Sequence, residues 1–170
     1  MSTYLFHPYT RFSAIENDKF PNIVKGKGVY LFDDNGKRYT DIISSWWACA
    51  LGHNHPKIVQ SIQKQTNLLQ HSITGSMTHP NVLELSERLA HLMPSPNRHC
   101  LFASDGSSSI EAALKISLQY WHNKGKAHKK WLVGMDQASH GDSLGALGVG
   151  FVDSFHAPYK RAVKNSLKSF

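Results

Sequence analysis

Residues 100–125, CLFASDGSSSIEAALKISLQYWHNKG, decide the fold of this chain. The apolar opening, residues 100–103, has the length and composition of a buried strand. After a short polar loop, four apolar residues recur with the period of one helix face: Ile110, Leu114, Leu118 and Trp121. Ser108 and Glu111 have the spacing of a capping box, which predicts a helix that begins near Ser108, and Gly125 is suited to end it.

The loop of this strand–loop–helix unit has a possible chemical use. Free N–H groups at a helix start, together with the positive end of the helix dipole, favour an anion. Gly106 lets an anion approach the backbone, and the hydroxyls of Ser107 and Ser108 are further donors. The loop has neither the Gly-Lys-Ser/Thr of a Walker loop nor a GxGxxG pattern. The alternative is an ordinary strand-to-helix connection with a good cap.

Composition sets outer bounds on the function. The chain has 170 residues, of which 41% are hydrophobic, so it can bury a core. The net charge of +7, from 19 basic and 12 acidic residues, raises the prospect of nucleic acid or small anions as ligands. The basic residues follow no recognised nucleic-acid pattern, so we expect a solvated basic face and no nucleic-acid partner.

Localisation follows from what the sequence lacks. The apolar runs are far shorter than the roughly 18 residues of a membrane span, so no membrane partner is expected. The first ten residues have neither the basic nor the apolar region of a secretory signal. Cys49 and Cys100 sit in apolar surroundings, form no CxxC pair and are expected to be buried reduced thiols. The sequence therefore predicts a cytoplasmic protein.

The order of elements predicts an α/β protein. Residues 29–32 and 38–42 are expected to form a hairpin around Asp33-Asp34-Asn35-Gly36. Helices are expected to begin at Pro56 and Pro80, and a small-residue helix after residues 139–143. A second buried strand is expected at residues 131–135. Strands that alternate with helices favour a layered domain with a mostly parallel sheet.

We therefore expect two parts in this chain. Residues 1–52 are expected to form an N-terminal segment with a small hairpin subdomain. Residues 53–170 are expected to form the first part of a large αβα domain. Only two strand–helix units are evident in the second part, fewer than a doubly wound sheet of ordinary width requires.

Three other patterns contain residue types that occur in ligand, metal or catalytic sites. Trp46-Trp47 suits either a core or a ligand wall, and core packing is the commoner role. His53 and His55 supply two imidazoles, but no further ligands occur at a familiar spacing, so no metal site is predicted. Residues 139–142, SHGD, contain the residue types of a hydrolytic triad, but sequence neighbours cannot adopt triad geometry.

Several stretches together resemble the class III pyridoxal-phosphate (PLP) aminotransferases, over nearly all of residues 5–160. The matching stretches are His7-Pro8-Tyr9-Thr10, Asp41-Ile42-Ile43-Ser44-Ser45-Trp46-Trp47-Ala48, Gly52-His53-Asn54-His55-Pro56, Asp105-Gly106-Ser107 with Ile110-Glu111-Ala112-Ala113-Leu114-Lys115, and His140-Gly141-Asp142. The resemblance implies a fold-type-I PLP-dependent transferase, present here as the N-terminal hairpin subdomain and the start of the large PLP-binding domain.

The resemblance also assigns site residues. The cofactor contacts that it implies are Gly106, Ser107 and His140. The substrate contacts that it implies are Tyr9, Trp47 and Ser139. Gly106 and Ser107 would hold the cofactor phosphate, as the loop itself suggests. Family members usually have an aromatic residue at the position of Ser139, which stacks on the cofactor ring, and serine cannot stack.

No catalytic residue is assigned within the chain. In the family, the lysine that forms the Schiff base with PLP lies beyond the point that corresponds to residue 170. The two steps that transamination needs, electron withdrawal and proton shuttling, therefore lack their residues here. We expect this chain to be an N-terminal portion that is inactive by itself.

The resemblance implies that the full enzyme catalyses a step of biotin synthesis. It would move an amino group from S-adenosylmethionine to 8-amino-7-oxononanoate, as a cytoplasmic homodimer. One alternative is a class III aminotransferase that acts on ω-amino acids. The presence of Trp47 and Tyr9 disfavours this alternative. Another is a non-catalytic remnant that binds a phosphate ligand or a partner subunit.

Overall fold

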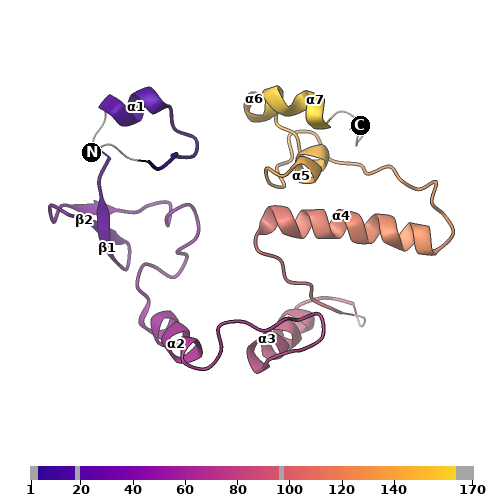
Figure 1. Ribbon diagram of the computed structural model, residues 1–170, viewed down its shortest axis with the longest axis horizontal. Helices are drawn as coiled ribbons and strands as arrows, with labels where there is room; N and C mark the ends of the chain where they lie inside the picture. The colour runs from indigo at the N-terminus through magenta and orange to yellow at the C-terminus, as the bar shows by residue number, and fades with distance from the viewer. Residues whose placement is uncertain (1–3, 18–19, 96–97, 164–170) are drawn as a thin grey trace. The chain divides into compact units, whose positions relative to one another are not determined.

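The computed structural model describes residues 4–17, 20–95 and 98–163. The chain divides into two compact units, residues 1–78 and residues 79–170. Figure 1 colours the first unit indigo to magenta and the second from rose to yellow. The expected boundary of the large PLP-binding domain, between residues 52 and 53, stays a prediction.

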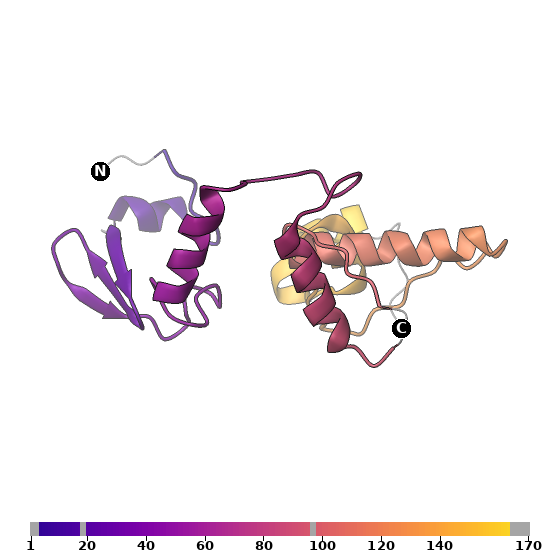
Figure 2. The same cartoon turned by 90° about the horizontal axis from the view of Figure 1, so that it is seen from below.

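An antiparallel sheet organises the first unit. Its strands are β1 (Ile23–Lys27), β2 (Tyr30–Asp33) and β3 (Arg38–Thr40), in the order β1-β2-β3, and Figure 2 shows them as neighbouring arrows. The predicted hairpin is therefore confirmed as β2 and β3. Its turn closes where the Gly36 N–H donates to the Asp33 carbonyl at 3.0 Å, with Gly36 at φ 78°. Strand β1 was missed, because Lys-Gly-Lys carries little strand signal.

Two helices accompany the sheet in the first unit, α1 (Phe12–Asn17) and α2 (Pro56–Thr66). Helix α2 begins at Pro56, as predicted, because proline needs no N–H partner in the first helical turn. From their helical spacing, Ile58, Ile62 and Leu69 are expected to form a buried stripe on and just after this helix, but all three are exposed in this structure, so that prediction is wrong.

The second unit contains the remaining helices. They are α3 (Pro80–His91), α4 (Gly106–Asn123), α5 (Leu144–Val149), α6 (Asp153–His156), the 3₁₀ turn η1 (Ala157–Tyr159) and α7 (Lys160–Val163). Helix α3 begins at Pro80 as predicted, while the short helices after residue 151 were not foreseen. Helix α5 contacts both α4 and α7, and the buried apolar side chains of the described residues are Ala146, Leu147, Val149 and Val163.

The ends of α4 correct one prediction and confirm another. The N-cap is Asp105, whose Oδ1 accepts from the Ser108 N–H at 2.7 Å. The proposed capping box of Ser108 with Glu111 is therefore wrong. At the other end Gly125 adopts φ 69°. The N–H groups of Gly125 and Lys126 donate to the carbonyls of His122 and Trp121, both at 2.9 Å, in a Schellman closure.

The two predicted buried strands are wrong for this structure. Residues 100–103 and 131–135 form no ladder with any described segment. Their large side chains are exposed, namely Leu101, Phe102, Trp131, Val133 and Met135. An apolar run becomes a strand only when a neighbouring strand accepts and donates its backbone hydrogen bonds. The mostly parallel sheet is therefore not assembled within the described residues, and most apolar side chains of both runs are exposed.

The two cysteines are free, as expected, but they are half-buried and not fully buried. The Cys100 thiol donates to the Ser86 carbonyl of α3 at a sulfur–oxygen distance of 3.6 Å. Within the described part of the chain, no helix is both long enough and apolar enough to span a membrane.

Candidate functional site

Helix α4 has 18 residues, and its N-terminus lies at an open surface. A Cβ placed on Gly106 meets nothing within 4 Å, so the backbone here is accessible. The Ser108 N–H holds the pKa of the Asp105 carboxyl below its usual range, with further help from the Ser108 and Ser104 hydroxyls. Asp105 is therefore ionised at neutral pH and occupies part of the positive end of the helix.

The loop hydroxyls are engaged within the protein, which differs from the expectation that they face an anion. Ser108 Oγ donates to Asp105 Oδ2 at 2.8 Å. Ser107 Oγ donates to Ser143 Oγ at 2.8 Å and accepts from the Ser143 N–H at 3.0 Å. The backbone N–H groups of Ser107 and Ser108 both interact with the Asp105 carboxylate.

A network around Glu111 ties this loop to α5. Glu111 Oε1 accepts from Ser143 Oγ at 2.7 Å and from the Gly145 N–H at 2.8 Å. The Ser143 hydroxyl, followed by backbone N–H groups at the start of α5, holds the pKa of the Glu111 carboxyl below its usual range despite partial burial. The carboxylate therefore acts as an anion at the N-terminus of α5 and fixes Ser143 against Ser107.

Gly141 makes the close approach between the two segments possible. It adopts φ 114°, and a Cβ there would lie 2.6 Å from Ser107 Oγ and 2.9 Å from Ser107 Cα. Its neighbour His140 is half-buried, and the ring Cδ2 lies 2.9 Å from a Cβ position on Gly150. Ser139 is exposed. The structure thus brings Gly141 and Ser143 against Ser107 of the predicted phosphate loop, whereas the His140 ring lies against Gly150.

The remaining predicted residues, Tyr9 and Trp47, lie in the first unit. Tyr9 is 77% exposed and meets the Trp46 ring edge-on, with ring centroids 5.3 Å apart. Trp46 and Trp47 have centroids 6.4 Å apart with an interplanar angle of 51°, and Trp47 is 78% exposed. The two indoles are not core residues in this structure, which leaves them available as a ligand wall.

Neither the histidine pair, His53 and His55, nor the SHGD stretch at residues 139–142 forms a metal or triad site among the described residues. No group of three or more His, Cys, Asp or Glu within the described ranges is placed to hold a metal ion. His53 Nε2 instead contacts Asp41 Oδ2 at 2.7 Å. In the SHGD stretch, Asp142 Oδ1 lies 3.5 Å from Nε2 of His156 in α6.

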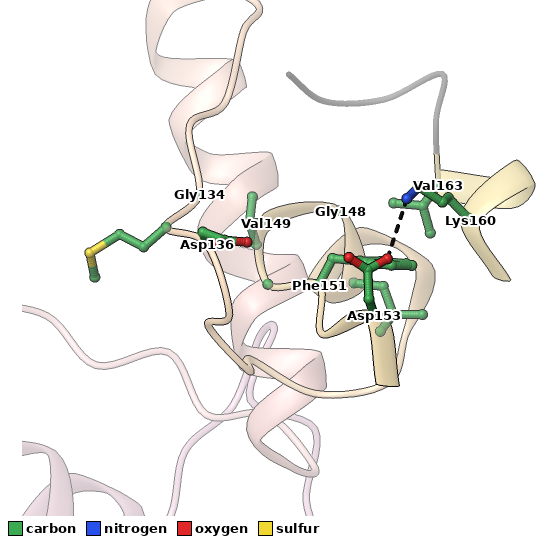
Figure 3. Close-up of a pocket in the computed structure, with 11 residues that line it drawn as sticks. Gly134, Asp136, Gly148, Val149, Phe151, Asp153, Lys160 and Val163 are labelled. Carbon is green, nitrogen blue, oxygen red and sulfur yellow. Dashed lines mark hydrogen bonds and ion pairs between the residues drawn. The ribbon is translucent and has the colours of Figure 1, made fainter. Parts of the chain in front are cut away.

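A pocket of about 190 Å³ lies elsewhere in the second unit, between residues 134–136 and the helices α5 to α7. Figure 3 shows Lys160 and Asp153 facing each other across it, with Nζ and Oδ1 3.3 Å apart. None of the predicted site residues lines this pocket. It is therefore separate from the helix terminus that carries Gly106 and Ser107.

Four residues that shape the candidate site were not predicted in these roles. They are Asp105 as the N-cap, Glu111 as the link to α5, Gly141 and Ser143. Asp105 had a local signal, because aspartate three residues before Ser108 is a standard N-cap. Ser143 and Glu111 are 32 residues apart and had no local signal.

Comparison with known proteins identifies the class. The class-III aminotransferase family profile matches residues 12–169. The chain belongs to the class-III aminotransferase family, whose members depend on PLP and have fold type I.

Among curated relatives, the chain is similar to adenosylmethionine-8-amino-7-oxononanoate aminotransferases. It is 35% identical to the one from Aquifex aeolicus over 166 residues, which is 97% of this chain and 36% of the relative. It is also 35% identical to the one from Staphylococcus aureus over 171 aligned positions, which cover 98% of this chain and 38% of the relative. The chain thus spans little more than a third of the length of these relatives.

Solved structures agree on the fold. The adenosylmethionine-8-amino-7-oxononanoate aminotransferase of Methanocaldococcus jannaschii superposes with a TM-score of 0.87 at 29% identity, over 93% of this chain and 36% of that one. A PLP-bound amine transaminase from an uncultivated Pseudomonas species gives a TM-score of 0.81 at 29% identity, over 92% of this chain and 36% of that one.

Proposed function

We propose that this chain forms the amino-terminal part of a PLP-dependent aminotransferase of biotin synthesis. The whole enzyme transfers an amino group from S-adenosylmethionine to 8-amino-7-oxononanoate, giving 7,8-diaminononanoate. It works as a cytoplasmic homodimer. The observation that carries this proposal is the helix N-terminus at Gly106 and Ser107, braced by the 140–143 loop, in a chain that matches enzymes of that name over nearly its whole length.

The residues at this terminus fit the phosphate end of PLP. The backbone beside Gly106 is open, the helix dipole favours a dianion, and the Gly106 and Ser107 N–H groups are donors. The close approach of Gly141 to Ser107 shapes the loop that receives the phosphate. His140 is in our proposal a neighbour of the cofactor ring, and the Ser139 side chain leaves room at the position of the usual stacking aromatic residue.

When bound, PLP supplies an electron sink for the transfer of an amino group. The part played by this chain is to hold the phosphate and to present Tyr9 and Trp47 to substrate. Tyr9 recognises the keto acid and Trp47 lines its pocket. The Schiff-base lysine is contributed by the part of the enzyme that corresponds to positions beyond residue 170, so we propose that the 170-residue chain alone does not catalyse transamination.

Two charge variants test the phosphate site in opposite directions. Asp105→Asn keeps an N-cap, since asparagine caps as well as aspartate, but removes a negative charge beside the proposed phosphate. It is expected to tighten PLP binding. Gly106→Asp adds a carboxylate that the helix N-terminus tolerates but that repels the phosphate, so it is expected to weaken binding. Gly106→Ser is the neutral control for the change in size.

The measurement is a PLP titration of the purified chain, followed by absorbance, with inorganic phosphate as competitor. Borohydride reduction and mass spectrometry then locate any covalent adduct. We expect weak binding that phosphate displaces and no adduct on a specific lysine. A stoichiometric adduct on one lysine would contradict the absence of a Schiff-base lysine. PLP binding that ignores phosphate and both charge variants would contradict the site at Gly106.

A second candidate function is amine or ω-amino acid transamination. The observation that favours it is the similarity to a solved amine transaminase, together with serine at position 139. An assay of the whole enzyme with S-adenosylmethionine and with ω-amino acids as donors separates the two. Use of ω-amino acids with no use of S-adenosylmethionine would exclude the biotin-synthesis assignment.

A further inference from the structure

The segment that carries the tryptophan pair has an unusual backbone. Four consecutive residues that are not glycine, Ser44 to Trp47, have φ values of 51°, 47°, 62° and 67°. This is a turn of left-handed helix, closed by the Trp47 N–H on the Ile43 carbonyl at 2.9 Å and the Cys49 N–H on the Ser44 carbonyl at 3.0 Å. L-residues in this conformation cost roughly 1–2 kcal/mol each, so surrounding contacts must hold the turn.

Asp41 supplies contacts of that kind. Its Oδ2 accepts from Ser45 Oγ at 2.8 Å and lies 2.7 Å from His53 Nε2. The Ser45 N–H, the Ser45 hydroxyl and His53 together lower the pKa of Asp41 to about 2. Because the carboxylate is ionised and only accepts hydrogen bonds, His53 Nε2 carries the proton in this contact.

His53 in turn is anchored on the sheet. Its backbone pairs with Gly28, the N–H of His53 donating to the Gly28 carbonyl at 2.8 Å and the Gly28 N–H donating back at 3.0 Å. Its side chain packs on β1 at Gly26, where an added Cβ would lie 2.7 Å from His53 Cβ. The side chains of Asp41 and His53 are only 6% and 13% exposed. A continuous set of contacts therefore runs from the hairpin through His53 and Asp41 to the left-handed turn.

We propose that Asp41 is a positioning residue, which through Ser45 and His53 holds the left-handed turn Ser44–Trp47 and so sets the direction of Trp46 and Trp47. Asp41 and His53 act on ligand through this turn, because their own side chains are only 6% and 13% exposed. The inference rests on the proposed function solely for the assignment of Trp47 to the substrate pocket. The geometry of the indole pair is a property of this chain without substrate or cofactor.

The experiment reads the indole pair directly. Two indoles 6.4 Å apart and tilted by 51° couple their electronic transitions, which gives a circular-dichroism couplet that depends on their mutual orientation. The Trp46→Phe variant identifies this signal against the other two tryptophans of the chain. Asp41→Ala removes the acceptor of Ser45 and His53, so the couplet is expected to be lost. Asp41→Asn is expected to retain it, because an amide oxygen at the position of Oδ2 still accepts from both Ser45 Oγ and His53 Nε2.

Ser44→Ala, one residue earlier in the same turn, leaves the contacts of Asp41 in place and is the matched control. A couplet that persists unchanged in Asp41→Ala would overturn the proposal. If Asp41→Ala loses cooperative unfolding altogether, Ser45→Ala decides, because it removes one hydrogen bond only. A weakened couplet in Ser45→Ala supports the proposal, and an unchanged one rejects it. PLP binding does not enter these measurements, so a failure of the proposed function leaves them unaffected.

Discussion

Replacement of Gly141 by alanine is expected to lower the free energy of unfolding by about 3 kcal/mol, from strained backbone and overpacking together. Gly141 has φ 114°, a region that side chains rarely adopt. The new Cβ would also lie 2.9 Å from Ser107 Cα, which belongs to the backbone and cannot turn away. Chemical denaturation followed by far-ultraviolet circular dichroism measures the loss. PLP binding is expected to fall with it, because Ser107 must move.

Gly106→Ala is the control for this substitution. Gly106 lies in the same unit and its Cβ position is open, so alanine there is expected to leave the free energy of unfolding unchanged or to raise it by up to about 1 kcal/mol. Equal stabilities of Gly141→Ala and the unmodified chain would show that the 140–143 loop does not pack on Ser107 in solution.

Replacement of Glu111 by alanine is the second substitution with a large expected effect. It leaves the Ser143 hydroxyl and the Gly145 N–H without their acceptor. Loss of an acceptor typically costs about 1–3 kcal/mol when the donors are buried, and we expect about 1–2 kcal/mol because water reaches part of this network. Glu84→Ala is the matched control. Glu84 pairs with Arg88 on the exposed face of α3, so its loss is expected to change stability by less than about 0.5 kcal/mol.

The same variant should alter the acid response of the protein. The pKa of Glu111 in the folded chain is lowered from its usual 4.5, chiefly by the Ser143 hydroxyl. A lowered folded-state pKa adds stability above the unfolded-state pKa and loses it as the pH falls through the folded-state value. Stability should therefore decline below about pH 4.5 less steeply in Glu111→Ala than in the unmodified chain. Parallel acid profiles for the two proteins would contradict a stabilising role for the ionised carboxylate.

Local features of the candidate site were predictable from the sequence. The period of apolar residues in 110–121 predicted α4, and the Gly125 closure follows from the tolerance of glycine for positive φ. The Asp33–Gly36 turn and the proline starts of α2 and α3 were equally local. In each case the residues that determine the structure lie within about one turn of one another.

Tertiary structure alone decided the contacts across longer stretches of chain. The Glu111 carboxylate accepts from the hydroxyl of Ser143, which lies 32 residues further along the chain. Residues 100–103 and 131–135 have strand-like sequences, yet a strand forms only with a partner, and no described segment supplies one.

The left-handed turn at Ser44–Trp47 shows most clearly what the local sequence does not predict. Nothing in Ser-Ser-Trp-Trp favours positive φ, and each of these residues intrinsically disfavours it. The conformation exists because Asp41 and His53, 12 residues apart, meet above the hairpin and accept or donate the hydrogen bonds that offset its strain. The sequence by itself determined helices α2 to α5, the β2–β3 hairpin and the loop that suits a phosphate. Packing between distant residues decided how Ser107, Trp46 and Trp47 are held, because those contacts depend on distances that no local pattern encodes.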